Sequence, residues 1–167
     1  MMDRGVYMKP TRVFIHGLES SGMGTKGVFF KDKYPDMIIE DFVGTFKDRM
    51  EKLNKILSGK ASLILVGSSY GGLMAAAYAF DNEKSVKKLI LLAPALDIYE
   101  FEPYLRRQLL LRVVLYHGRD DDVVAPSSVQ DIARTVFANL EYHLVDDDHS
   151  LHRTFSLMNW DDLLETL

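Results

Sequence analysis

Three residue types that together activate a hydroxyl nucleophile occur at the ends of predicted strands in this sequence. Ser69 is the central residue of GSSYG at 67–71, a G-x-S-x-G pattern. In this pattern a strand turns sharply into a helix and lifts the serine hydroxyl out of the sheet, and the glycines let other backbone approach closely. An apolar run precedes Ser69 and an alanine-rich stretch follows it. This context favours a nucleophile over a glycine-rich turn without chemistry.

A serine nucleophile needs a base to take its proton and an acid to orient that base. Asp121 follows Ser69 by 121 − 69 = 52 residues, and His149 follows Asp121 by 149 − 121 = 28. Each comes shortly after a predicted strand. The chain order Ser, Asp, His is the one that accompanies a G-x-S-x-G turn in α/β-hydrolases. We therefore predict Ser69 as nucleophile, His149 as base and Asp121 as acid.

The acid has three competitors. Asp120 and Asp122 flank Asp121 in a run whose ordinary interpretation is a solvated acidic turn. Asp97 follows the strand predicted at 88–93, and some hydrolases take their acid from that strand end. The sequence leaves these alternatives open.

The other four histidines are expected to have structural roles. His152 lies three residues after His149, at the entry to a predicted helix. His16 and His117 each precede a glycine at a strand end, where imidazole commonly bonds loop backbone. His143 lies inside a strand pattern and is expected at the surface or satisfied in the core.

The pattern of apolar residues predicts the elements that position these side chains. Short apolar runs predict six strands, and apolar residues at helical spacing predict helices between them. The strands are predicted at 11–16, 37–40, 61–66, 88–93, 112–117 and 140–145, and the helices at 45–57, 73–80, 127–137 and 154–164. This alternation predicts an α/β fold, a three-layer sandwich around a mainly parallel sheet of about six strands. Ligands bind at the carboxyl ends of such strands.

Length and composition bound the class of protein. The 167 residues predict a single domain at 11–167, preceded by an N-terminal extension or alternative start at 1–10. The net charge of −4 argues against nucleic acid as a partner. The absence of cysteine excludes a thiol nucleophile. No apolar run is long enough for a membrane span and no secretory signal is visible, so the expected location is the cytoplasm.

Two motifs point to other chemistry. Gly22, Gly24 and Gly27 match G-x-G-x-x-G, with Glu40 or Asp41 where a ribose-binding acid would lie. However, that fingerprint needs its first glycine at the end of the strand, and Gly22 lies six residues beyond His16. The acidic and histidine residues at 146–152 suggest a metal site, but consecutive loop residues point in different directions. We expect neither a dinucleotide nor a metal.

The sequence resembles the α/β-hydrolase superfamily over residues 11–164. FIHGLESSG at 14–22 is similar to its oxyanion loop, and HGRDDDVVAP at 117–126 is similar to its HGxxDxxVP acid loop. That resemblance places the acid four residues after His117, on Asp121. It also implies an oxyanion hole made by the backbone N–H groups of Leu18 and Tyr70.

The sequence departs from the family pattern at two points. Ala125 is an additional residue before Pro126, and DDDHSL stands around His149 where a glycine is more frequent. Within the superfamily, the serine-rich loop followed by Lys26 resembles the small YqiA-like bacterial esterases, which have little or no lid.

These observations predict a serine hydrolase that cleaves carboxylic esters or thioesters and needs no cofactor. Residues 97–111, where a lid would be inserted, hold only about one short helix, so the site is expected to be exposed. A non-catalytic binding module on a hydrolase scaffold is the alternative, and a dinucleotide-binding oxidoreductase comes third. The acyl chain, the leaving group and the oligomeric state do not follow from the sequence.

Overall fold

A single six-stranded sheet organises the chain. The computed structural model describes residues 8–166, so the expectation for residues 1–10 lies largely outside the described part. The sheet order is β2-β1-β3-β4-β5-β6, and every neighbouring pair is parallel. The strands are β1 (Thr11–Ile15), β2 (Ile38–Ile39), β3 (Leu63–Ser68), β4 (Val86–Leu92), β5 (Leu109–Gly118) and β6 (Phe137–Val145). The predicted α/β fold is confirmed.

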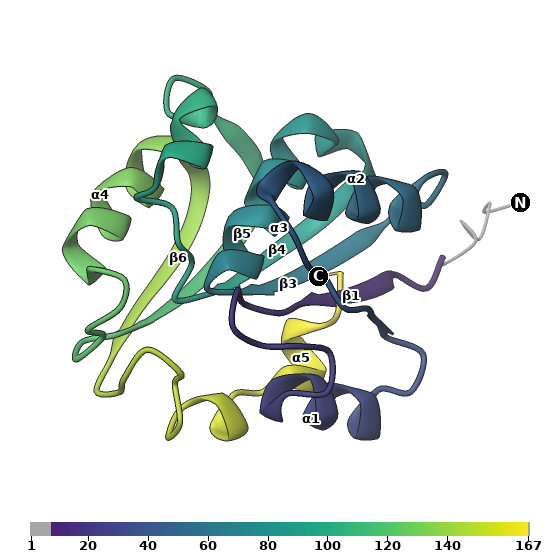
Figure 1. Cartoon of the computed structure of the whole chain (residues 1–167), viewed down its shortest axis with the longest axis horizontal. Helices are drawn as coiled ribbons and strands as arrows, with labels where there is room; N and C mark the ends of the chain where they lie inside the picture. The colour runs from purple at the N-terminus through teal and green to yellow at the C-terminus, as the bar shows by residue number, and fades with distance from the viewer. Residues whose placement is uncertain (1–7, 167) are drawn as a thin grey trace, which may run out of the picture.

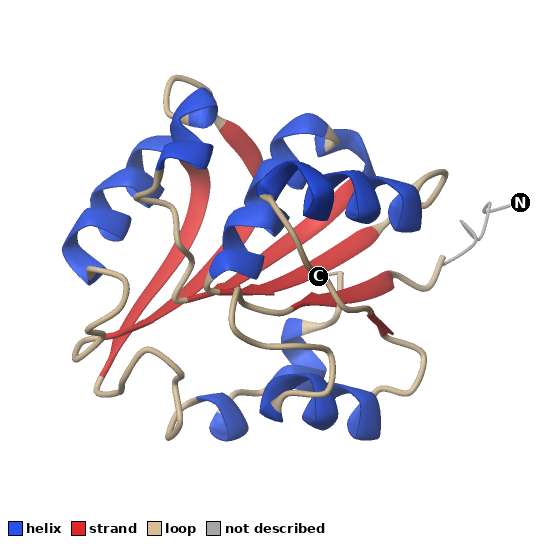
Figure 2. Cartoon of the chain, viewed as in Figure 1, coloured by secondary structure: helices blue, strands red, loops and turns tan. Residues whose placement is uncertain are grey.

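Side chains alternate between the two faces of a sheet. Each face of this sheet is covered by its own helices (Figures 1 and 2). In β3, for example, Leu63 and Leu65 join one apolar cluster and Ile64 and Val66 join the other. One face is covered by α2 (Phe46–Leu57), α3 (Tyr70–Asp81) and α4 (Pro126–Val136). The other is covered by α1 (Thr25–Lys33) and α5 (Trp160–Leu163). The central strands are therefore apolar on both sides.

The order of the strands reverses direction between β1 and β3. From β1 the chain moves outward to β2, and from β3 it proceeds the opposite way through β4, β5 and β6. Such a switch point leaves a crevice outside the carboxyl ends of its two strands, where ligands bind in open α/β sheets. Gly17 and Leu18 follow β1, and Ser69 follows β3. The topology therefore brings the predicted nucleophile and oxyanion loop to the same crevice.

Two segments differ from the sequence prediction. The single helix predicted at 154–164 is wrong, because Phe155–Leu157 forms a short 3₁₀ helix and α5 begins separately after Asn159. The Asn159 side chain accepts the Asp162 N–H and so starts a new helix. Trp160 and Leu164 are fully buried, whereas Met158 and Leu163 are only partly buried. Helix α1 was not predicted at all.

No helix among residues 8–166 has the length and apolar character needed to cross a membrane.

Candidate active site

Ser69 lies at a strained turn between β3 and α3. Its backbone has φ 55° and ψ −115°, a conformation that L-residues rarely adopt. The flanking glycines are required by space: a Cβ on Gly67 would lie 2.4 Å from the Gly71 carbonyl oxygen, and one on Gly71 would lie 2.1 Å from that of Ile15. The G-x-S-x-G pattern therefore forms the sharp strand-to-helix turn that the sequence predicted.

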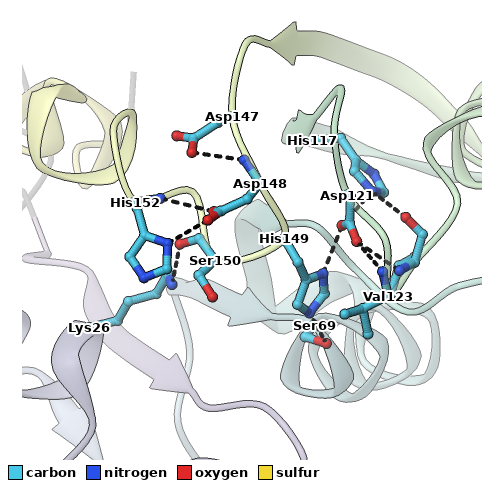
Figure 3. Close-up of polar contacts among 11 residues, drawn as sticks. Lys26, Ser69, His117, Asp121, Val123, Asp147, Asp148, His149, Ser150 and His152 are labelled. Carbon is cyan, nitrogen blue, oxygen red and sulfur yellow. Dashed lines mark hydrogen bonds and ion pairs between the residues drawn. The ribbon is translucent and has the colours of Figure 1, made fainter.

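His149 connects Ser69 to Asp121 (Figure 3). Its Nε2 is 3.0 Å from Ser69 Oγ, and its Nδ1 is 2.7 Å from Asp121 Oδ2. Because the ionised carboxylate only accepts, Nδ1 carries the proton, which leaves Nε2 free to accept from the serine hydroxyl. Three residues that are 52 and 28 positions apart in sequence thus form one hydrogen-bonded chain.

The Asp121 carboxylate is buried and fully hydrogen-bonded. Its Oδ1 accepts the N–H groups of Val123 and Val124, both at 2.8 Å, and its side chain has no exposed area. Burial raises the pKa of Asp121, but the N–H of Val124, the His149 side chain and the N–H of Val123 oppose it, and the net pKa lies below the ordinary 3.8. Asp121 is therefore an anion that faces the His149 ring.

His117 is a second partner of Asp121, a relationship that the sequence did not reveal. Its Nε2 lies 3.0 Å from Asp121 Oδ2 and 3.0 Å from the Val124 carbonyl oxygen, and the side chain is entirely buried. Because both neighbours are acceptors, Nε2 carries the proton and donates. The predicted bond to loop backbone exists, but the same proton also faces the acid. The four-residue spacing between His117 and Asp121 in HGRDD was the sequence feature that could have indicated this contact.

The loop that carries His149 is anchored by Asp147. This buried carboxylate accepts the N–H groups of Asp148, Arg153 and Thr154 at 2.7–3.0 Å. The loop also lies against the end of β5, because the Asp120 N–H donates to the Asp147 carbonyl and a Cβ on Gly118 would lie 2.3 Å from the Asp148 carbonyl oxygen. The acid loop and the base loop therefore hold each other in place.

The competing acids lie elsewhere. Asp120 and Asp122 are exposed, and Asp97 is exposed on the wall of the cavity beside Ser69. Within residues 8–166, His149 bonds to none of the three. The structure therefore brings Asp121, and not its competitors, to the histidine.

The remaining histidines have local partners. His16 lies 2.7 Å from the Gly17 carbonyl oxygen and accepts the Phe42 N–H. His143 bonds Glu141 and stacks on Tyr116, with ring centroids 4.3 Å apart. His152 is largely exposed and bonds Asp148 at 2.6 Å.

A cavity of about 780 Å³ opens beside Ser69 and His149. Leu18 and Tyr70 line it, as the oxyanion prediction requires. Tyr70 is the first residue of α3, so its N–H has no acceptor within the helix. Gly17, in the loop after β1, lies next to the nucleophile: a Cβ there would be in ordinary van der Waals contact with the Ser69 Cβ at 3.5 Å.

The cover over this cavity is small. The 3₁₀ helix Tyr99–Tyr104 in the predicted lid region buries Phe101 and Tyr104 against Phe80 of α3 instead of closing over the serine. From this region only Asp97 and Ile98 reach the cavity wall.

The glycine pattern at 22–27 has a structural explanation. Asp41, one of the two acids at the position that a ribose-binding residue takes in that motif, accepts the Gly22 N–H at 2.7 Å. A Cβ on Gly27 would lie 2.1 Å from the Gly22 carbonyl oxygen. A glycine at position 27 therefore lets the first turn of α1 pack against the loop that precedes the helix. Among the described residues no cluster of histidine and carboxylate side chains is arranged to hold a metal ion.

Comparisons with known proteins agree with the fold. A family model for serine aminopeptidases, S33, matches residues 15–116. No curated protein sequence matches the chain. Among solved structures, mouse alpha/beta hydrolase domain-containing protein 10 superposes with a TM-score of 0.78 at 20% identity, over 94% of this chain and 90% of that one.

Two bacterial structures show the same fold. A putative YdeN-like hydrolase from Pectobacterium atrosepticum has a TM-score of 0.71 at 19% identity, over 93% of this chain and 87% of that one. A Bacillus cereus carboxylesterase has a TM-score of 0.70 at 15% identity, over 94% of this chain and 89% of that one.

Proposed function

This chain belongs to the serine aminopeptidase S33 family of α/β-hydrolases, and on that premise we propose that it cleaves carboxylic esters or thioesters through an acyl-enzyme intermediate. One observation carries the proposal: His149 bonds Ser69 through Nε2 and Asp121 through Nδ1. This arrangement suits a base that takes a proton from one side while its tautomer is held from the other.

In the proposed first half-reaction, Ser69 Oγ attacks the acyl carbonyl carbon while its proton moves to His149 Nε2. Asp121 stabilises the resulting imidazolium. The tetrahedral intermediate then collapses, the bond to the leaving group breaks, and His149 returns the proton to the alcohol or thiol that departs. In the second half-reaction water attacks the acyl-enzyme with His149 as base, and the acid and free Ser69 are released.

The oxyanion hole in this proposal consists of two backbone N–H groups, those of Leu18 and Tyr70. A negative charge develops on the carbonyl oxygen in both half-reactions, and fixed donors stabilise it more than mobile water does. The position of both residues on the cavity wall supports this assignment.

Esters and thioesters suit the cavity better than peptides with a free amino terminus. An aminopeptidase must accommodate the cationic α-ammonium of its substrate. Here Phe14, Phe29 and Phe155 line the cavity together with the half-buried Lys26, whereas the two acids that also line it, Glu19 and Asp97, are exposed to solvent. An apolar wall with a lysine favours an uncharged or anionic acyl compound.

The test is turnover of 4-nitrophenyl butyrate, butyryl-CoA and leucine 4-nitroanilide, with labelling by a fluorophosphonate probe. We expect hydrolysis of an oxygen ester or the thioester, and no labelling of the Ser69→Ala variant, which should remain folded. The Ser68→Ala variant is the matched control, because it removes the neighbouring hydroxyl. Labelling that survives Ser69→Ala would refute the nucleophile. A folded wild type that neither turns over substrate nor reacts with the probe would favour the non-catalytic binding module.

A further inference from the structure

Lys26 is the only lysine or arginine among the described residues that line the cavity. It lies in the first turn of α1, is half-buried, and donates to the carbonyl oxygen of Ser150 at 2.7 Å. Ser150 directly follows His149, and Figure 3 shows Lys26 on the opposite side of the His149 loop from Asp121. A half-buried ammonium thus borders the same cavity as the nucleophile.

The acids nearest to Lys26 are satisfied by other donors. Asp147 accepts three backbone N–H groups, and Asp148 accepts the ring and backbone N–H of His152. Within residues 8–166, Lys26 itself forms no ion pair. Burial lowers the pKa of the Lys26 ammonium, and the charges of Asp148 and Asp147 only partly offset that effect. Its charge is therefore incompletely compensated.

The surroundings of this cation are aromatic. Phe29 and Phe155 contact each other edge to face with centroids 5.0 Å apart, and both line the cavity. The Lys26 Nζ is 5.4 Å from the centre of the Phe155 ring. An ammonium has three protons, and one of them is used by Ser150. An apolar surface that ends at a cation with donors to spare complements an apolar group that carries an anion.

We propose that Lys26 binds a carboxylate of the substrate, so that the preferred substrate is an ester or thioester with an apolar body and an anionic group. Lys26 is then a specificity-determining residue. This inference rests on the proposed hydrolase function and specifies its substrate class. The carboxylate belongs either to the acyl chain or to the leaving group.

The experiment compares two pairs of esters that differ in charge. The mono-4-nitrophenyl ester of glutaric acid and 4-nitrophenyl pentanoate share a five-carbon acyl chain, and only the first is anionic on the acyl side. The pair 4-(pentanoyloxy)benzoate and phenyl pentanoate places the anion on the leaving group. For the wild type we expect kcat/KM to be about tenfold higher for the anionic member of one pair, as one charge-assisted hydrogen bond allows.

Three variants separate recognition from positioning. In Lys26→Met the ratio of the anionic to the neutral kcat/KM should fall to about one, because the lost bond to Ser150 affects both esters whereas the lost charge affects only the anionic one. Lys26→Arg should keep the preference, because it keeps the charge. Lys31→Met is the matched control, since Lys31 lies exposed on the same helix and outside the cavity lining; it should behave as wild type.

Three outcomes would overturn the inference or the function separately. Equal losses on both members of each pair in Lys26→Met would show that Lys26 only holds the His149 loop. A wild type that hydrolyses neutral esters without any preference would overturn the inference and leave the function intact. If the wild type hydrolyses neither an ester nor a thioester, the function fails, and calorimetric binding of 4-phenylbutyrate still decides the inference. We expect binding that weakens about tenfold in Lys26→Met, and equal affinities would refute the inference.

Discussion

His117 and Asp121 form a buried hydrogen bond of 3.0 Å behind the predicted active site, and neither side chain has exposed area. The oxygen involved, Oδ2, is the same one that bonds His149. Asp121 is therefore oriented from behind by one histidine while it orients another in front. A change to His117 can therefore affect the predicted base through this shared oxygen atom.

Replacing His117 by leucine should reduce both stability and turnover. The substitution removes a donor from a buried carboxylate, which costs about 1–3 kcal/mol of unfolding free energy. It should also lower kcat for an ester more than it raises KM, because Asp121 is less firmly placed. His117→Gln, which keeps an N–H donor, should recover part of both losses. Urea unfolding and steady-state kinetics measure them, and a leucine variant with unchanged kcat would contradict this role.

The acid assignment predicts different results for neighbouring residues. Asp121→Asn should reduce kcat by about 10³ to 10⁴, because an amide neither stabilises the imidazolium nor holds the required tautomer. Asp120→Asn and Asp122→Asn are matched controls with exposed side chains, and each should change kcat less than about twofold. Ester hydrolysis at saturating substrate measures the effect. Similar losses at all three positions would disprove the assignment.

The free energy of unfolding should decrease as the pH is lowered through the acid range. The pKa values of Asp121 and Asp147 lie below the ordinary 3.8, because their hydrogen bonds together outweigh the burial that raises them. Their stabilising contribution is therefore complete above the unfolded-state pKa and is lost as pH decreases through the folded-state values. We expect the urea midpoint to drop below about pH 4.

The Asp147→Asn variant tests the source of that dependence. It should be less stable than wild type at pH 7 and should lose less stability between neutral and acid pH, because one of the titrating groups is gone. Parallel curves for variant and wild type would show that Asp147 does not contribute.

Gly118→Ala should displace the loop that carries His149. The added Cβ would meet the backbone carbonyl oxygens of Asp148 and Asp147 at 2.3 and 2.4 Å, and backbone cannot rotate away. We expect a loss of about 1–3 kcal/mol in unfolding free energy and a marked decrease in kcat. Gly24→Ala is the control, since its nearest atom is the Ser20 hydroxyl oxygen, the end of an exposed side chain. Equal effects of the two substitutions would refute the argument.

Local patterns in the sequence were sufficient for most of the fold. Strands buried on both faces are continuously apolar, as at 63–66, and the capping residue Thr45 marks the start of α2. The C-terminal segment was mispredicted because its apolar spacing fits one helix, whereas the Asn159 side chain begins a second one. Helix α1 was missed because it has no apolar stripe at helical spacing: only Gly27 and Phe30 of its nine residues are buried.

By itself, the sequence determined the residue types and their order: a serine in a turn that only glycine neighbours permit, then aspartates and a histidine after later strands. Such features depend on neighbouring residues and on strand periodicity, which are local. Only the tertiary structure decided that His149 meets Asp121 and not Asp120, Asp122 or Asp97, that His117 supports the same carboxylate, and that Lys26 shares the cavity with Ser69. Apart from the contact between His117 and Asp121, which are four residues apart, these relationships join distant parts of the chain. They arise from the sheet register and from which loops lie side by side at its edge.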